Sequence, residues 1–345
     1  MHPPRVVALA ALVLSLLGCQ APPPDRPSVQ PAAQPAAAAT PARVPVRLAQ
    51  AYVASSLIPL WLAQENGYFR EQGLDVEALL MRGSIEGVQA LAAGEVQGLL
   101  TAPTPATIGA AIQDPDIVIL GTLSNRLQYQ FVSNVPTVPE LRGKRIGISR
   151  PGDASYSLAV QTLERYGLGV QDIQFASVGN IPERLAALVS GQVDGTVVTT
   201  PLNVQAVKAG FYQVADLGDL GIPYIATSIH MKRSYAEQNP AVTDGLLKGF
   251  MQGVHAVVAQ PAQAKALFTK YLDLRDEDEL EAAYQTNALG GERTLAPSMS
   301  GLQDVITQLA AENPGAAGMR AEQFVDLRAV QQIEASGFVQ QLWDQ

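Results

Sequence analysis

The stretch ALAAGEVQGLLTAP, residues 90–103, returns 97 positions later as ALVSGQVDGTVVTTP, residues 187–201. Alanine, leucine, glycine, valine and glycine recur at identical spacing, and each copy ends in threonine-containing residues and a proline. Solenoid proteins repeat every ~20–50 residues and do so more than twice. Two copies this far apart instead predict two related half-domains.

The residues around each copy predict the same order of elements, which is strand, helix, strand, helix, strand. In the first half the apolar periodicity predicts strands at 45–52, 74–81 and 96–102 and helices at 56–73 and 83–95. In the second half it predicts strands at 144–150, 173–179 and 193–200 and helices at 153–167 and 180–192. Alternating strands and helices indicate parallel-rich sheets with right-handed crossovers.

Two further segments connect the halves. Residues 116–134 are β-rich and can cross from one lobe to the other, and residues 223–233 can cross back. From Pro240 onward the pattern is mostly helical, and these helices would cover the first lobe. The expected fold is therefore α/β, with two lobes, a cleft between them, and a helical C-terminal part on lobe one. We expect lobe one to comprise residues 45–124 and 225–345, and lobe two residues 125–224.

The N-terminus predicts export and a lipid anchor. Residues 6–17 are an apolar run that follows Arg5 and is shorter than the about 20 residues that a membrane-spanning helix needs. LLGC, residues 16–19, resembles the bacterial lipobox, so residues 1–18 are expected to be a lipoprotein signal peptide and Cys19 the lipidated residue. An ordinary signal with an incidental cysteine is the alternative. The Pro/Ala-rich residues up to 44 complete a spacer, 19–44, between anchor and fold.

Composition narrows the partners. The formal charge of −9 disfavours nucleic acid, which needs an excess of Lys and Arg. One cysteine allows neither an internal disulfide nor a cysteine-based metal site. His230 and His255 have no Asp, Glu or His partner at ligand spacing, so we expect no metal and no cofactor.

Several segments in order resemble one family: AQENGYFREQGLDVE, GVQALAAGEVQG, LRGKRIGISRPGDAS, RLAALVSGQVDG and VKAGFYQVADL. They are similar to the substrate-binding proteins of ABC importers, in the nitrate/sulfonate/taurine-binding, NMT1/THI5-like group. The resemblance implies a type II periplasmic-binding fold that closes on a ligand about a two-strand hinge. It also implies an extracytoplasmic monomer whose partners are an ABC permease and its ATPase.

Ligands of open α/β sheets bind beyond the carboxyl ends of the strands, which selects the candidate site. The candidates in lobe one are Tyr52, Ser55, Ser56, Arg82, Gly83, Ser84, Thr101 and Thr104; those in lobe two are Arg150, Gly152, Ser155, Asn180 and Thr200, with Tyr224 on the return crossing. Each has an alternative role. Ser84, Ser155 and Asn180 can cap helices, the two arginines can be solvated, and the tyrosines can be packed in the core.

The expected function is capture of a small polar or anionic organic molecule by a membrane-anchored, extracytoplasmic binding protein that delivers it to an ABC importer. No catalytic motif such as G-x-S-x-G or H-E-x-x-H is present, so we expect a binding protein and not an enzyme. A module that feeds a membrane sensor and an exported enzyme on the same scaffold remain the alternatives.

Overall fold

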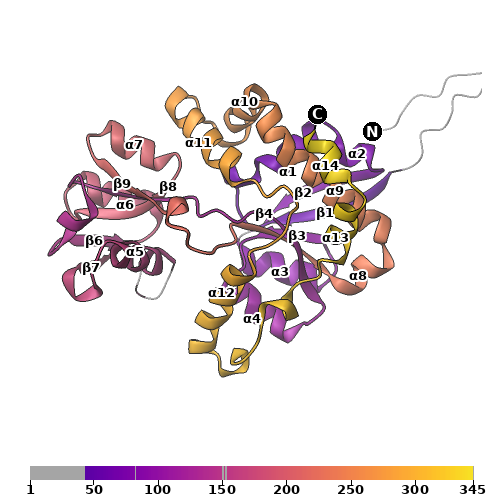
Figure 1. Ribbon diagram of the computed structural model, residues 1–345, viewed down its shortest axis with the longest axis horizontal. Coiled ribbons are helices and arrows are strands. Elements are labelled where there is room, and N and C mark those ends of the chain that lie inside the picture. The colour runs from indigo at the N-terminus through magenta and orange to yellow at the C-terminus, as the bar shows by residue number, and fades with distance from the viewer. Residues whose placement is uncertain (1–42, 82, 150, 152–153, 345) are drawn as a thin grey trace, which may run out of the picture. The chain divides into compact units, whose positions relative to one another are not determined.

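The computed structural model of the protein describes residues 43–81, 83–149, 151 and 154–344 (Figure 1). The predicted export signal and Cys19 lie outside these residues, as do the candidates Arg82, Arg150 and Gly152. In the part of the chain that is described, no helix combines the length and the apolar character needed to cross a bilayer.

The first sheet has the strand order β2-β1-β3-β10-β4. Its strands are β1 (Val44–Gln50), β2 (Leu74–Leu80), β3 (Gly98–Thr101), β4 (Ile117–Ser124) and β10 (Thr227–Lys232). β1 pairs in parallel with β2 and β3, whereas β10 pairs antiparallel with β3 and β4. The antiparallel strand is the segment predicted to cross back. We call this sheet and its helices lobe one.

The second sheet has the order β7-β6-β8-β5-β9 and belongs to lobe two. Its strands are β5 (Tyr129–Ser133), β6 (Arg145–Ile148), β7 (Gln174–Ser177), β8 (Gly195–Thr199) and β9 (Tyr212–Asp216). β6 is parallel to β7 and β8, and β5 is antiparallel to β8 and β9. The predicted α/β class with parallel-rich sheets is confirmed, and each sheet includes one antiparallel strand that arrives from the other lobe.

Helices flank both sheets. Those that follow the first-sheet strands in the N-terminal part are α1 (Ile58–Glu65), α2 (Tyr68–Glu71), α3 (Ser84–Ala92) and α4 (Pro105–Gln113). Lobe two contains α5 (Ala154–Arg165), α6 (Ile181–Val189) and α7 (Leu202–Lys208). The C-terminal helices are α8 (Arg233–Gln238), α9 (Pro240–Ala259), α10 (Pro261–Leu272), α11 (Glu277–Gly290), α12 (Met299–Glu312), α13 (Arg328–Ala335) and α14 (Phe338–Trp343).

The repeated phrase is the same helix and strand in both lobes. Adding 97 to the bounds of α3, 84 and 92, gives 181 and 189, which are the bounds of α6. The same shift carries the first residue of β3, Gly98, onto the first residue of β8, Gly195. The equivalence inferred from sequence therefore holds residue by residue.

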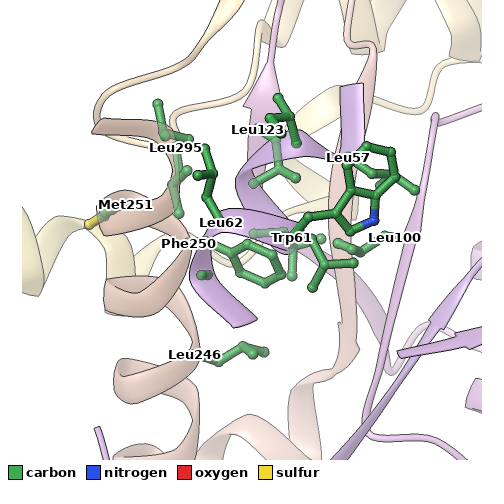
Figure 2. Close-up of a cluster of buried hydrophobic side chains, with 14 of the residues drawn as sticks. Leu57, Trp61, Leu62, Leu100, Leu123, Leu246, Phe250, Met251 and Leu295 are labelled. Carbon is green, nitrogen blue, oxygen red and sulfur yellow. The ribbon is translucent and has the colours of Figure 1, made fainter. Parts of the chain in front are cut away.

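The largest apolar cluster holds α9 against α1 and the first sheet. Figure 2 shows Phe250 pointing from α9 toward α1, where Leu62 and Trp61 lie. Trp61 is 2% exposed and stacks on Tyr271 with 4.6 Å between ring centroids, so it is a core residue as expected. Full burial of an apolar side chain such as Leu62 or Phe250 stabilises the fold by about 1.5–3 kcal/mol.

Several elements differ from the sequence-based expectation. The helix predicted at 56–73 is interrupted, because Gly67 has a φ of +78°, a left-handed conformation that ends α1 before α2 begins. Ser84 is the first residue of α3 and not its cap; Gly83 occupies the cap position without a side-chain bond. Helices α4 and α7 and strand β9 were not predicted.

Candidate functional site

A four-residue connection brings the carboxyl ends of the two sheets together. Residues 125–128 join Ser124, which is paired with Thr227 in the first sheet, to Tyr129, which is paired with Thr199 in the second. Even a fully extended chain spans at most about 18 Å between Ser124 and Tyr129. The carboxyl strand ends of the two sheets, where ligands bind in folds of this kind, are therefore joined by one short connection.

Thr227 is the centre of a buried hydroxyl network in lobe one. Its Oγ1 lies 2.9 Å from the Tyr52 hydroxyl and donates to Ser56 Oγ at 3.1 Å. The Tyr52 hydroxyl also lies 3.3 Å from the carbonyl oxygen of Ala226, to which it donates. Tyr52 and Ser56, both predicted from sequence, thus meet on a strand that arrives about 175 residues later. Ser55 is the first residue of the same short 3-10 helix and is buried.

A second pair of predicted residues meets at the end of β3. Ser84 Oγ and Thr101 Oγ1 are 2.8 Å apart. Ser228 Oγ donates to the Thr101 carbonyl at 2.7 Å and lies 2.8 Å from His230 Nε2. Burial lowers the pKa of His230 to about 4, so the ring is neutral at physiological pH. His230 is therefore a structural histidine, as expected.

The remaining candidates in lobe one and lobe two serve helix starts. Thr104 caps α4 through a reciprocal pair of bonds with Thr107. Asn180 caps α6 in the same manner: its Oδ1 accepts from the Glu183 amide at 3.0 Å. Ser155 lies in the first turn of α5, where its Oγ accepts from the Ser149 amide at 2.8 Å.

Three tyrosines surround the crossings. Burial raises the pKa of the Tyr224 phenol well above its usual range, and the nearby Tyr129 and Tyr52 phenols raise it further. Burial also raises the pKa of Tyr52, opposed by its bond with Thr227. Tyr224 and Tyr52 are therefore neutral at physiological pH. Tyr129 and Tyr224 pack on the same apolar cluster of lobe two.

Helix α11 of the C-terminal part reaches α7 of lobe two. Thr200, at the end of β8, has its Oγ1 3.5 Å from Thr286 Oγ1 on α11. Lys208 on α7 forms ion pairs with Asp276 and Asp278 at the start of α11, at 2.9 Å for Asp278. The acidic start of α11 thus binds a lysine of the other lobe.

Sequence reasoning did not identify Thr227, Ser228, Tyr129 or Thr286. Thr227 and Ser228 lie in the segment predicted to cross back, and that position was the available signal in the sequence. In the structure both residues pair with the end of β4. Thr286 lies in a helix with no motif, and only the fold places it beside Thr200.

Other parts of the described surface are hollowed as well. One hollow of about 260 Å³ is lined by residues that include Glu237, Asp326 and Arg328, near the start of α9. Another of about 480 Å³ is lined by residues of both crossings and the ends of α11 and α12. Neither lining includes a predicted site residue. Across the described residues, no group of three or more His, Cys, Asp or Glu side chains could hold a metal ion.

Comparison with known proteins adds relatives of one kind. The chain is 26% identical over 213 residues to the taurine-binding periplasmic protein of Escherichia coli K12, a match that covers 60% of this chain and 65% of the relative. It is 28% identical over 196 residues to a putative aliphatic sulfonates-binding protein of the same organism, covering 54% of this chain and 59% of the relative. The chain thus spans about three fifths of the length of the curated relatives it matches.

Solved structures share the fold. The periplasmic aliphatic sulphonate binding protein SsuA from Escherichia coli has a TM-score of 0.64 and 20% identity, covering 82% of this chain and 97% of that one. The desulfurization enzyme DSZB has a TM-score of 0.64 and 16% identity, covering 84% and 99%. A family model described as NMT1/THI5 like matches residues 54–264, which include strands of both sheets. The chain belongs to the NMT1/THI5-like family.

Proposed function

We propose that the protein is an extracytoplasmic solute-binding protein that captures a small polar or anionic organic molecule between its lobes and delivers it to an ABC importer. One observation carries the proposal. The short connection at 125–128 brings the hydroxyl-bearing carboxyl ends of two sheets together, in a chain whose family includes periplasmic binding proteins. Closure would add contacts from both lobes, so that a ligand shifts the population toward the closed state.

Sulfonates are the first ligand class to test. Two relatives are named for taurine and for aliphatic sulfonates. The hydroxyls of Ser84 and Thr101 are neutral groups of the kind that binds oxyanions, and they already lie within hydrogen-bond distance of each other. A ligand would therefore join an organised network, which lowers the entropy cost of binding.

The membrane anchor remains a proposal based on LLGC at residues 16–19. Acylated Cys19 would hold the protein at a membrane surface, where a permease and its ATPase would be its partners. Metabolic labelling with a fatty acid should label the protein, and Cys19→Ala should abolish the label. Labelling that survives the substitution would contradict the proposal.

A thermal-shift screen tests binding directly. We would use protein that begins at Ala21, with taurine, alkanesulfonates, nitrate, pyrimidines, flavins and aromatic carboxylates. A ligand at a hundred times its dissociation constant should stabilise the fold by about 2.7 kcal/mol. Thr101→Ser, which keeps the hydroxyl but removes a methyl, should retain the response, whereas Thr101→Val should reduce it. Thr307→Val, on the exposed face of α12, is the control for loss of a hydroxyl.

Chemical conversion of a bound ligand would contradict the proposal. The likeness to a desulfurization enzyme shows a shared fold and no shared chemistry. Mass spectrometry of any bound ligand after prolonged incubation should recover it unchanged. A product with altered mass would establish an enzyme instead of a binding protein.

A further inference from the structure

Arg184 is a buried charged residue of lobe two, and the equivalent position of lobe one is a glycine. Arg184 lies on α6 and is 3% exposed. The shift of 97 places it on Gly87 of α3, and places Thr196 of β8 on Leu99 of β3. In lobe one Leu99 fills the space, because a Cβ on Gly87 would lie 2.6 Å from its Cδ1. In lobe two Arg184 Nε instead donates to Thr196 Oγ1 at 3.2 Å.

A second pair of equivalent positions on the same helix and strand is polar in lobe one and apolar in lobe two. In lobe one Ser84 at the start of α3 is hydrogen-bonded to Thr101 at the end of β3. The equivalent residues of lobe two are Ile181 and Val198, which belong to one apolar cluster. Each lobe therefore joins this helix to this strand by one polar and one apolar contact, at exchanged positions.

The other donors of Arg184 hold backbone carbonyls at the edge of the cleft. Its Nη1 donates to Gly179 O at 2.7 Å, and its Nη2 donates to Val197 O at 3.0 Å. Thr196 passes the connection on, since its Oγ1 donates to Gly147 O at 2.8 Å. One guanidinium thus links the loop before α6 to β8 and, through Thr196, to β6. Hydrogen bonds from a charged donor are stronger than neutral ones, and the planar fork suits two carbonyls at once.

The loop that Arg184 holds has little freedom of its own. Gly179 has a φ of +125°, and a Cβ there would lie 2.0 Å from Glu183 Oε2. The next residue, Asn180, caps α6 at the carboxyl end of β7, where the proposed ligand would meet lobe two. Without the guanidinium, the Gly179 carbonyl would lose its 2.7 Å partner in the lobe interior.

We infer that Arg184 is a positioning residue of the proposed ligand site, which sets the direction of residues 179–180 at the edge of the cleft. This inference rests on the proposed function. Lobe one joins the equivalent helix and strand with Ser84 and Thr101, whose hydroxyls meet at the carboxyl end of β3. In lobe two the buried Arg184 holds the loop from the interior, so the backbone of this loop and Asn180 would contact the ligand.

Hydrogen exchange of the ligand-free protein tests the positioning. The double variant Arg184→Gly with Thr196→Leu reproduces the Gly87 and Leu99 pair of lobe one, so the interior stays filled. Loss of the charged donors should speed amide exchange at Asn180, Ile181 and Glu183 by about ten-fold or more, without a similar change elsewhere in lobe two. Arg145→Met is the matched control, because Arg145 Nη2 donates to a single carbonyl, Gly191 O, at the opposite end of the sheet.

Chemical rescue separates a positioning role from a packing role. In the single variant Arg184→Gly, millimolar guanidinium chloride should slow the exchange of Asn180, Ile181 and Glu183 again, whereas equal sodium chloride should not. Exchange that is unchanged in the variants, or that rises uniformly across lobe two, would overturn the inference.

Taurine binding by calorimetry keeps this inference distinguishable from the proposed function. If the native protein binds taurine, Arg184→Gly should weaken binding by at least about ten-fold and guanidinium should restore it. Equal affinity in the variant would overturn the role of Arg184 and leave the binding function intact. If the native protein binds no member of the ligand panel, the proposed function fails, and the exchange experiment still decides whether Arg184 holds the loop.

Discussion

His230 should make the stability of lobe one depend on pH. The ring is 3% exposed on β10, and burial lowers its pKa from 6.5 to about 4. The unfolded chain takes up a proton near pH 6.5, whereas the folded chain resists until about pH 4. The stabilising contribution is therefore complete above pH 6.5 and is lost as the pH falls from 6.5 to about 4.

The magnitude follows from that difference. At about 1.4 kcal/mol per pH unit, the interval between 6.5 and about 4 corresponds to about 3 kcal/mol of unfolding free energy. The hydrogen bonds of Ser228 determine which ring nitrogen of His230 carries the proton. The Ser228 hydroxyl donates to Thr101 O, so its oxygen accepts from the Nε2–H group of His230. A second proton would have to enter the buried ring at Nδ1.

Urea unfolding followed by circular dichroism, at neutral pH and near pH 4.5, measures the effect. His230→Gln keeps a side-chain N–H donor but cannot be protonated in this range, so its stability should fall less on acidification than that of the native protein. Groups that titrate in both proteins cancel in this comparison. His255→Gln, at a half-buried position on α9, is the control and should leave most of the difference in place. Equal acid dependence of native protein and His230→Gln, or a ring that titrates near pH 6.5 by NMR, would refute the reasoning.

Four further substitutions test packing and contacts in the fold. Thr227→Val keeps the shape but removes the hydroxyl at the centre of the network, and should lower the unfolding free energy by about 1–3 kcal/mol in urea titrations; an unchanged value would contradict the network. Gly253→Ala should cost about 1–3 kcal/mol or more, because its Cβ would lie 2.1 Å from the backbone oxygen of Pro59, whereas Gly109→Ala, with open space at its Cβ, should stabilise α4 by about 0.5–1 kcal/mol. The two should shift the melting temperature in opposite directions. Lys208→Met should reduce the salt dependence of the melting temperature, and an unaltered dependence would show that its ion pairs do not form in solution.

The alternation of elements was predictable because it rests on local periodicity. Strands buried on both faces and amphipathic helices leave patterns over short windows, and both five-element units were recognised from them. Helix α4 was not predicted, because Thr104 was assigned to the candidate ligand site. Pro105, the first residue of α4, is nevertheless a typical helix start signal. The break at Gly67 depends on one residue with positive φ inside an otherwise continuous apolar pattern.

The contacts of the candidate site were less predictable than its position. The rule that ligands bind at carboxyl strand ends selected Tyr52, Ser84 and Thr101 as candidates, and their role in binding stays a prediction. Their partners could not be inferred, since Thr227 is 175 residues from Tyr52 in the chain. Such long-range pairing depends on β10 being inserted between β3 and β4, which local patterns do not report.

The repeated phrase itself shows why similarity between the halves indicates fold more than chemistry. The residues that recur at equal spacing, such as Gly98 and Gly195, are those that close packing against neighbouring strands requires: a Cβ on Gly98 would lie 2.7 Å from Leu48 of β1, and one on Gly195 would lie 3.0 Å from Phe131 of β5. The residues that differ, Gly87 against Arg184 and Leu99 against Thr196, decide whether a polar contact lies at the cleft or beneath it. Two lobes with one plan can therefore present different groups to a single ligand, hydroxyls from one side and a held backbone from the other. A molecule bound between them would be recognised in one orientation, because its two ends would meet different chemistry.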